Sequence, residues 1–387
     1  MPKTIDIRRA ALVAALSLAA LCGGAGLAWA QGDGAGEAPA LEVSAGAWAV
    51  TDLETGEYLD GDEASGQRPM ASTTKVMGAL VALEADPEEE VTVSEEAAAF
   101  AVPAYSNVGL LPGDRLSVRE LLMASMISSG DDAAYALAEH VGNGSVERFV
   151  GMMNEKAAQM GLEDTSFENP VGFDARDHHT SAGDLAEMTR VAMQNPEFRE
   201  MVSTEYATIA TPDREIPLAN TNELLFAYPP ATGVKTGTTP AAGESLVASA
   251  AMGDEAYAVV VLDAKEDRFV AARRALEHAF AAYDRTALVV EGRKYAGADV
   301  PYRREESIDL VAARSVEGLV DASPEVEREI RVMDDPPDSA RPGTRLGEVV
   351  VKVDGRVVGE SPLVARRGYA EASLWERVWY TVGGVFA

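Results

Sequence analysis

Cysteine and histidine are scarce in this sequence, and their scarcity excludes several kinds of catalytic site. The 387 residues contain one cysteine, Cys22, and four histidines. A chain with one cysteine cannot form an internal disulfide or a zinc site built from several Cys ligands. His178 and His179 are adjacent, so on regular structure their rings point apart, and no H-E-x-x-H motif occurs. We therefore expect neither a metal site nor a Ser-His-Asp triad.

Positive charge is also in short supply. The chain has 33 Lys and Arg residues against 63 Asp and Glu residues, a formal net charge of -30. Such a surface repels nucleic-acid phosphates, and no basic stripe is present, so nucleic-acid binding is not expected. Apolar residues make up 47% and charged residues 25%, which is typical of a globular protein with a buried core.

Residues 1–30 have the pattern of a secretory signal peptide. Basic residues precede an apolar stretch, and Ala28-Trp29-Ala30 fits the small-x-small cleavage pattern. A retained membrane anchor is the alternative, but glycines interrupt the apolar stretch. Cleavage after Ala30 would leave no cysteine and therefore no thiol catalysis. We expect an exported protein, extracellular or periplasmic, in which residues 31–40 form a linker rich in Gly, Ala and acidic residues.

The rest of the chain divides into two regions by its hydrophobic pattern. Residues 41–283 begin with alternating stretches around Glu54-Thr55-Gly56, continue with apolar residues at helical spacing, and end in three strand-like segments and a helix. This order predicts an α/β (α+β) catalytic domain, with a mainly antiparallel sheet and a helical cluster against it. Residues 284–369 predict a small all-β domain, in which Asp354-Gly355 forms a type I′ hairpin turn.

Residues 370–387 predict an amphipathic helix. The 15 residues from Ser373 would form a helix of about 22 Å, shorter than the roughly 30 Å hydrocarbon core of a bilayer. We expect this helix to lie in the interface at the outer face of the cytoplasmic membrane. Packing against the all-β domain is the alternative. The predicted apolar face carries Trp375, Val378, Trp379 and Val382, with Phe386 on or near it.

A serine and a lysine stand three positions apart at the start of an apolar run, RPMASTTKVMGAL. On a helix, Ser72 Oγ and Lys75 Nζ would share one face and could approach within about 3 Å. A serine hydroxyl is a poor nucleophile until a base accepts its proton, and a desolvated lysine near other cations can do so. The free N–H groups at a helix start could also stabilise an oxyanion. Taken alone, S-x-x-K occurs by chance in many proteins, and an ordinary helix start with a snorkelling lysine is the favoured explanation.

Two further motifs favour the catalytic interpretation. Ser129-Gly130-Asp131 lies at a predicted helix start, and Lys235-Thr236-Gly237 lies in the first of the late strands. The order S-x-x-K, S-x-N-like, K-T-G is that of penicillin-binding proteins and serine β-lactamases. From Ala47 onward the chain resembles the low-molecular-mass D-alanyl-D-alanine carboxypeptidases. The resemblance extends to the flanking stretches Asn169-Pro170-Val171-Gly172-Phe173, Thr180-Ser181-Ala182-Gly183-Asp184-Leu185-Ala186 and Asn220-Thr221-Asn222-Glu223-Leu224-Leu225.

The resemblance implies an acyl-enzyme mechanism on peptidoglycan stem peptides. Ser72 would attack the carbonyl between the two terminal D-alanines and release D-alanine, after which water would release the shortened stem. Lys75 would accept the proton in acylation, and Ser129 would relay a proton toward the leaving amine. β-Lactam antibiotics would act as acylating inhibitors, and no metal or organic cofactor would be needed.

The resemblance also implies how substrate is held. Lys235, Thr236 and Thr238 would bind the terminal carboxylate. Gly237 would let the substrate backbone lie against the strand edge, where any side chain would obstruct it. The backbone N–H groups of Ser72 and Thr238 would form the oxyanion hole.

Asp131 departs from the family pattern, which usually has Asn at this position. A carboxylate cannot donate the amide hydrogen bond that Asn gives to substrate, and it could pair with Lys75 or Lys235 and raise the pKa of that lysine. We expect activity, because Asp is nearly isosteric with Asn. The alternatives are a wall-associated pseudoenzyme or binding protein disabled by Asp131, and a transpeptidase or D,D-endopeptidase that uses the same acyl-enzyme.

A class A β-lactamase is a further alternative. Such an enzyme activates its deacylating water with a Glu, usually in an E-x-x-x-N motif well after the second motif. The only match past Asp131 is Glu139 with Asn143, within the helix expected to follow at once. We therefore disfavour this interpretation.

Overall fold

A five-stranded antiparallel sheet is the framework of the first region. The computed structural model describes residues 41–303, 306–321 and 324–383, so the predictions for residues 1–40 and for Phe386 lie outside the described residues. The strand order is β2-β1-β9-β8-β7, and every neighbouring pair is antiparallel. The strands are β1 (Ala45–Asp52), β2 (Tyr58–Asp62), β7 (Ala231–Thr239), β8 (Gly243–Met252) and β9 (Glu255–Ala264). The β1–β2 hairpin and the three late strands were expected from the sequence, and both predictions are confirmed.

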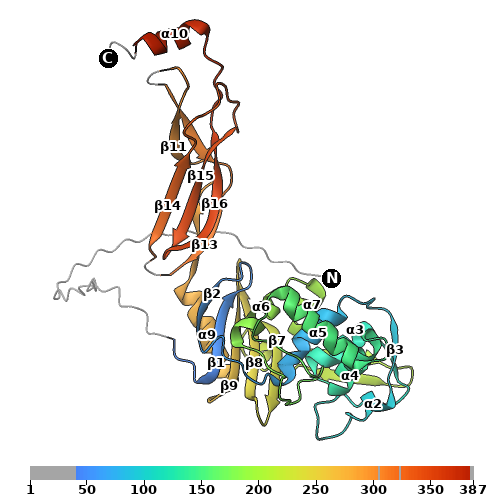
Figure 1. Ribbon diagram of the computed structural model, residues 1–387. Helices are drawn as coiled ribbons and strands as arrows, with labels where there is room; N and C mark the ends of the chain where they lie inside the picture. Colours follow the sequence, from blue (N-terminus) through green and yellow to red (C-terminus); the bar gives the residue numbers. More distant parts are fainter. Residues whose placement is uncertain (1–40, 304–305, 322–323, 384–387) are drawn as a thin grey trace, which may run out of the picture. The chain divides into compact units, whose positions relative to one another are not determined.

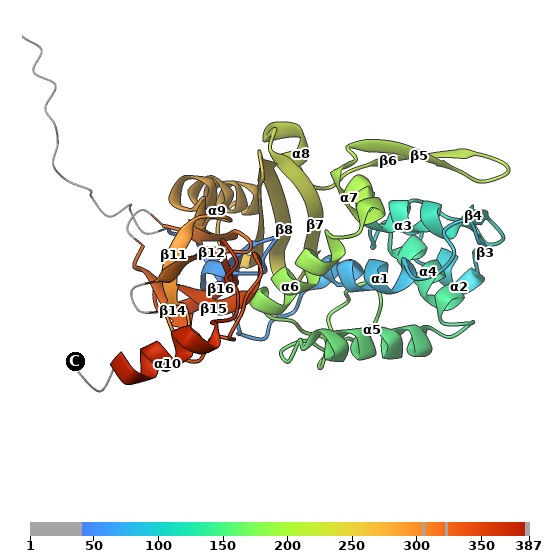
Figure 2. The same cartoon turned by 90° about the horizontal axis from the view of Figure 1, so that it is seen from above.

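The sheet is covered on both faces, because successive side chains of a strand point in opposite directions. In β9, Val260 and Leu262 pack with the helical cluster, whereas Val259 and Val261 pack with α9 (Arg268–Ala282). Figure 2 shows α9 on the opposite side of the sheet from α1 and α6. The first region therefore has two hydrophobic cores, one on each face of the same sheet.

The helical cluster and two short antiparallel strand pairs lie between β2 and β7 in the chain (Figure 1). Ser117 and Glu120 form a capping box at the start of α3, since Ser117 Oγ accepts from the Glu120 N–H and the Glu120 carboxylate accepts from the Ser117 N–H. The helices are η1 (Ala71–Thr74, a 3-10 turn), α1 (Lys75–Ala82), α2 (Glu95–Ala98), α3 (Val118–Ile127), α4 (Asp131–Val141), α5 (Val146–Met160), α6 (Ala182–Ala192), α7 (Pro196–Ser203) and α8 (Leu224–Ala227). The antiparallel pairs join β3 (Glu90–Thr92) with β4 (Arg115–Ser117) and β5 (Tyr206–Ala210) with β6 (Glu215–Ala219).

The second region is built from strands, as predicted. A five-stranded sheet has the order β11-β12-β16-β15-β14, and β10 pairs with β13. Asp354 and Gly355 have φ of 49° and 79°, as a type I′ turn requires at both central positions. The strands are β10 (Asp284–Val289), β11 (Lys294–Asp299), β12 (Ser307–Ala312), β13 (Val316–Val320), β14 (Val326–Val332), β15 (Arg345–Val353) and β16 (Arg356–Ala365). The predicted fold class is confirmed, and the exact domain boundaries stay predictions.

The last described helix is α10 (Leu374–Gly383), which is shorter within the described residues than the 15-residue helix expected. Its polar side chains contact the second region, with Arg303 Nε 3.2 Å from Glu376 and the Arg377 guanidinium 4.7 Å from the Tyr302 ring centroid. Trp375 and Trp379 are 83% and 79% exposed. None of the helices in the described ranges is long and apolar enough to span a bilayer.

Candidate active site

Ser72 lies in the short 3-10 turn that leads directly into α1. The residue before it, Ala71, has φ of 49°, a left-handed conformation that is unfavourable for a residue with a Cβ. Ser72 is partly exposed, whereas Lys75 at the start of α1 is only 1% exposed. Lys75 Nζ donates to Ser72 Oγ at 2.9 Å. The close approach predicted from helical spacing is confirmed.

The buried ammonium of Lys75 has three acceptors. Besides Ser72 Oγ, Nζ donates to Asp131 Oδ1 at 2.6 Å and to the carbonyl of Val171 at 2.8 Å. These bonds use all three N–H donors of a protonated lysine. Burial lowers the pKa of Lys75 below its usual 10.5, and the carboxylate of Asp131 acts in the opposite direction. The proposed pairing of Asp131 with a lysine is confirmed for Lys75.

The segment 169–173 supplies the third acceptor and fits closely against the turn of Ser72. The side-chain oxygen of Asn169 accepts from the backbone N–H groups of Val171, Gly172 and Phe173, which fixes the loop. Gly172 has φ of 99°, and a Cβ added there would lie 2.0 Å from the Ala71 carbonyl oxygen. Only glycine allows this approach. Segment 169–173 therefore holds the Val171 carbonyl against Lys75 Nζ and packs on the 3-10 turn that carries Ser72.

Strand β7 lies on the other side of the same turn. A Cβ added at Gly237 would lie 3.0 Å from Ala71 Cβ and 3.1 Å from Ser72 N. The missing side chain therefore lets the turn of Ser72 approach the strand, a constraint not foreseen from the sequence. The predicted approach of a substrate backbone to Gly237 stays a prediction.

The remaining predicted residues of β7 differ in accessibility. Lys235 is 1% exposed and donates to the carbonyl of Thr236 at 3.0 Å. Burial, with repulsion from Lys75 as the next cause, brings its pKa well below 10.5. Thr236 Oγ1 lies 2.6 Å from Thr221 Oγ1, whereas Thr238 is exposed. Thr238 is therefore the side chain of this motif that a ligand reaches most directly.

A cavity of about 260 Å³ brings three of the predicted residues together. Ser72, Asp131 and Thr238 line it, and Lys75 lies directly behind Ser72 and Asp131. The structure also describes the other predicted residues. Four of them are buried and do not line this cavity: Ser129, Lys235, Thr236 and Gly237. Ser129 stands two positions before Asp131, with φ of 60°.

Aromatic side chains form one wall of this cavity, and the sequence did not predict them as site residues. Tyr105 and Phe173 line it, with ring centroids 5.0 Å apart. Phe100 lies behind them, 5.4 Å from the Tyr105 centroid. This wall is suited to the apolar parts of a ligand.

Arg268 is another residue that the sequence did not indicate. Its Nη1 donates to the Gly237 carbonyl at 3.0 Å and to Thr238 Oγ1 at 2.9 Å. Arg268 is the first residue of α9, where a cation interacts unfavourably with the helix dipole. That misfit is a signal that could have identified it. No spacing motif connects it to Lys235-Thr236-Gly237.

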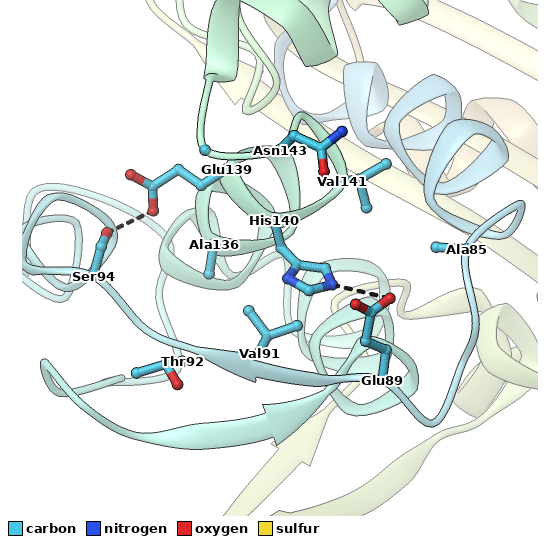
Figure 3. Close-up of a pocket in the computed structure, with 11 residues that line it drawn as sticks. Ala85, Glu89, Val91, Thr92, Ser94, Ala136, Glu139, His140, Val141 and Asn143 are labelled. Carbon is cyan, nitrogen blue, oxygen red and sulfur yellow. Dashed lines mark hydrogen bonds and ion pairs between the residues drawn. The ribbon is translucent and has the colours of Figure 1, made fainter.

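A larger cavity of about 540 Å³ lies at the other end of α4 and is separate from these residues (Figure 3). Glu139 and Asn143 line it, with Ser94 Oγ donating to the Glu139 carboxylate at 2.5 Å. Glu139 is eight residues after Asp131 in the numbering, about 12 Å along a helix axis. The E-x-x-x-N match therefore faces a different cavity from Ser72, which disfavours a class A β-lactamase mechanism.

Comparison with known proteins agrees with this geometry. The sequence profile of the D-alanyl-D-alanine carboxypeptidases, peptidase family S11, matches residues 34–266. D-alanyl-D-alanine carboxypeptidase DacF of Bacillus subtilis is 32% identical over 86% of this chain and 88% of its own. DacD of Escherichia coli is 31% identical over 87% and 90%. Penicillin binding protein 5 of Haemophilus influenzae superposes with a TM-score of 0.68 at 26% identity, covering 85% of this chain and 98% of its own. The chain belongs to the D-alanyl-D-alanine carboxypeptidase family.

Proposed function

We propose that this chain is a serine-type D-Ala-D-Ala carboxypeptidase that removes the terminal D-alanine of peptidoglycan stem peptides. One observation carries the proposal: the buried Nζ of Lys75 lies 2.9 Å from Ser72 Oγ, at the wall of a cavity. The snorkelling alternative fails, because a snorkelling lysine places its charge in water and Lys75 is 1% exposed. A buried amine beside a serine hydroxyl is suited to general-base activation.

The proposed reaction gives each predicted residue a role. In the fraction of molecules in which Lys75 has lost its proton, its amine accepts the hydroxyl proton as Ser72 Oγ bonds to the scissile carbonyl carbon. The N–H groups of Ser72 and Thr238 stabilise the oxyanion. When the C–N bond breaks, the proton that Lys75 accepted passes through Ser129 to the leaving amine of D-alanine. Water then attacks the acyl-enzyme and gives a proton to Lys75, and this proton returns to Ser72 Oγ as the bond to the shortened stem breaks.

Charge and hydroxyl groups on β7 and α9 are suited to the substrate carboxylate. Arg268 is partly exposed and donates to the hydroxyl of Thr238, which lines the cavity. Guanidinium and hydroxyl donors together bind a carboxylate strongly. Lys235 is buried and does not line the cavity.

The experiment that tests this function uses the protein without residues 1–30. It is incubated with a diacetyl-lysyl-D-alanyl-D-alanine tripeptide, and released D-alanine is measured. In parallel, intact mass is recorded before and after excess benzylpenicillin. D-Alanine release that stops when the penicillin adduct forms supports the carboxypeptidase. An adduct without D-alanine release would favour an endopeptidase or transpeptidase, and absence of both would favour a pseudoenzyme disabled by Asp131.

Replacing Asp131 by Asn is expected to shift the pH dependence of acylation. Burial lowers the pKa of Lys75 and the carboxylate of Asp131 raises it, so removal of the carboxylate lowers that pKa further and leaves a larger fraction of Lys75 neutral at a given pH. The acid limb of the pH–rate profile should move to lower pH, and the acylation rate at a given pH on that limb should rise on the order of tenfold. Asp254→Asn, which removes the same charge from an exposed turn, is the control. An unmoved acid limb would mean that Lys75 is not the base.

We also propose that the protein is exported and attached peripherally to the outer face of the cytoplasmic membrane. The support is α10, whose polar face contacts the second region while Trp375 and Trp379 remain exposed. Aromatic side chains with this exposure are suited to the headgroup region. Replacing both tryptophans by alanine should weaken cosedimentation with anionic vesicles several-fold. Equal cosedimentation of the variant and the wild type would contradict the attachment.

A further inference from the structure

His178 is a buried imidazole that the proposed mechanism does not use. The side chain is 2% exposed and lies in the segment before α6, outside the residues that line the active-site cavity. The backbone N–H of Glu168 donates to His178 Nδ1 at 3.0 Å, and His178 Nε2 lies 2.8 Å from Thr74 Oγ1. Both ring nitrogens therefore have a partner, one on each side of the ring.

The directions of these hydrogen bonds follow from the partners. A ring nitrogen that accepts from an amide N–H carries no proton, so the proton of the neutral ring is on Nε2. His178 Nε2 therefore donates to Thr74 Oγ1, and the Thr74 hydroxyl donates to the carbonyl of Ala71 at 2.8 Å. Burial lowers the pKa of His178 to about 4, with His179 acting in the same direction and Asp174 against it. The ring is neutral near pH 7, as this pattern requires.

The chain of hydrogen bonds ends at the peptide group that joins Ala71 to Ser72. In a trans peptide the C=O and N–H groups lie in one plane and point in opposite directions. A bond that fixes the Ala71 oxygen therefore also fixes the direction of the Ser72 N–H. Ala71 is in the left-handed region, and such a conformation persists only where the surroundings impose it.

We propose that His178 is a positioning residue that sets the direction of the Ser72 N–H, the oxyanion donor, through Thr74 and the Ala71 carbonyl. This inference rests on the proposed function. Hydrogen bonds in series also polarise one another, so the donor at the end is strengthened as well as aligned. The competing role is purely structural: His178 could serve only to hold the Glu168 backbone.

Two amide substitutions separate these roles, because each keeps one of the two hydrogen bonds. In His178→Gln the amide NH₂ reaches the place of Nε2 and can still donate to Thr74. In His178→Asn the shorter side chain reaches only the place of Nδ1 and can still accept from Glu168. We expect His178→Asn to slow the first-order acylation step with benzylpenicillin about tenfold, and His178→Gln to stay within about threefold of wild type. Rapid-mixing kinetics separates this step from penicillin binding, which should change little.

A second pair of variants tests the middle of the chain. Thr74→Val removes the hydroxyl with little change of shape and should slow acylation to a similar extent, whereas Thr74→Ser should restore it. In the Thr74→Val background, His178→Asn should have no further effect, because both changes break the same chain. This pair keeps the inference testable if His178→Asn does not fold, which a melting curve shows.

The outcomes are distinct. A slow His178→Gln with a normal His178→Asn would assign His178 to the Glu168 backbone and overturn the inference. Acylation at the wild-type rate in all four single variants would also overturn the inference. If wild type itself formed no acyl-enzyme, the proposed function would fail first, and this result is recognisable without any variant.

Discussion

Replacing Ser72 by alanine is expected to abolish the benzylpenicillin adduct and to reduce D-alanine release by at least about 10³-fold. No acyl-enzyme can form without the hydroxyl, and Lys75 then has no nucleophile to activate. The fold should persist, since Ser72 is partly exposed and its side chain contributes one hydrogen bond, from Lys75. Intact mass and a D-alanine assay give the result, and a melting curve confirms that the variant is folded.

The control for this variant is Ser203→Ala, which removes a hydroxyl from an exposed serine at the end of α7. That protein should form the adduct at the wild-type rate. An adduct that persists in Ser72→Ala would identify another nucleophile, and peptide mapping would locate it. Ser129 would be the first candidate, because it lies two residues before Asp131, which contacts Lys75.

The local features of this fold could be read from the sequence because short-range rules determine them. The 2.9 Å contact between Lys75 and Ser72 follows from helical periodicity, and the type I′ turn follows from Asp354-Gly355. The β5–β6 hairpin was not predicted. Its second strand contains Pro217, a residue that weakens a strand pattern.

The parts of the site that the sequence did not predict depend on long-range contacts. Asp131 had two candidate partners, and the structure pairs it with Lys75, while Lys235 donates to the carbonyl of Thr236 in its own strand. The carbonyl of Val171 contacts Lys75 from 96 positions away. A backbone acceptor has no side-chain signature, so no motif could identify it. For the same reason, no motif could predict the series of hydrogen bonds from His178 through Thr74 to the Ala71 carbonyl.

The second large effect is expected from Lys75→Met, which replaces the amine with an apolar side chain of similar length. Acylation should fall by about 10³-fold or more, because the base is lost. The variant should also lose roughly 3–5 kcal/mol of stability, because Asp131 is left as a buried carboxylate without its cation. Urea denaturation measures the second effect, and the acylation rate measures the first.

The double variant Lys75→Met/Asp131→Asn separates these two effects. Asn carries no charge, so the double variant should recover most of the lost stability and still form no acyl-enzyme on the wild-type time scale. A double variant that regained acylation together with stability would show that Lys75 serves the fold and not the chemistry. If the single variant were as stable as wild type, the 2.6 Å contact would contribute little to folding. Lys75 is established as the base, and not only as the cation that neutralises Asp131, if stability returns in the double variant and acylation does not.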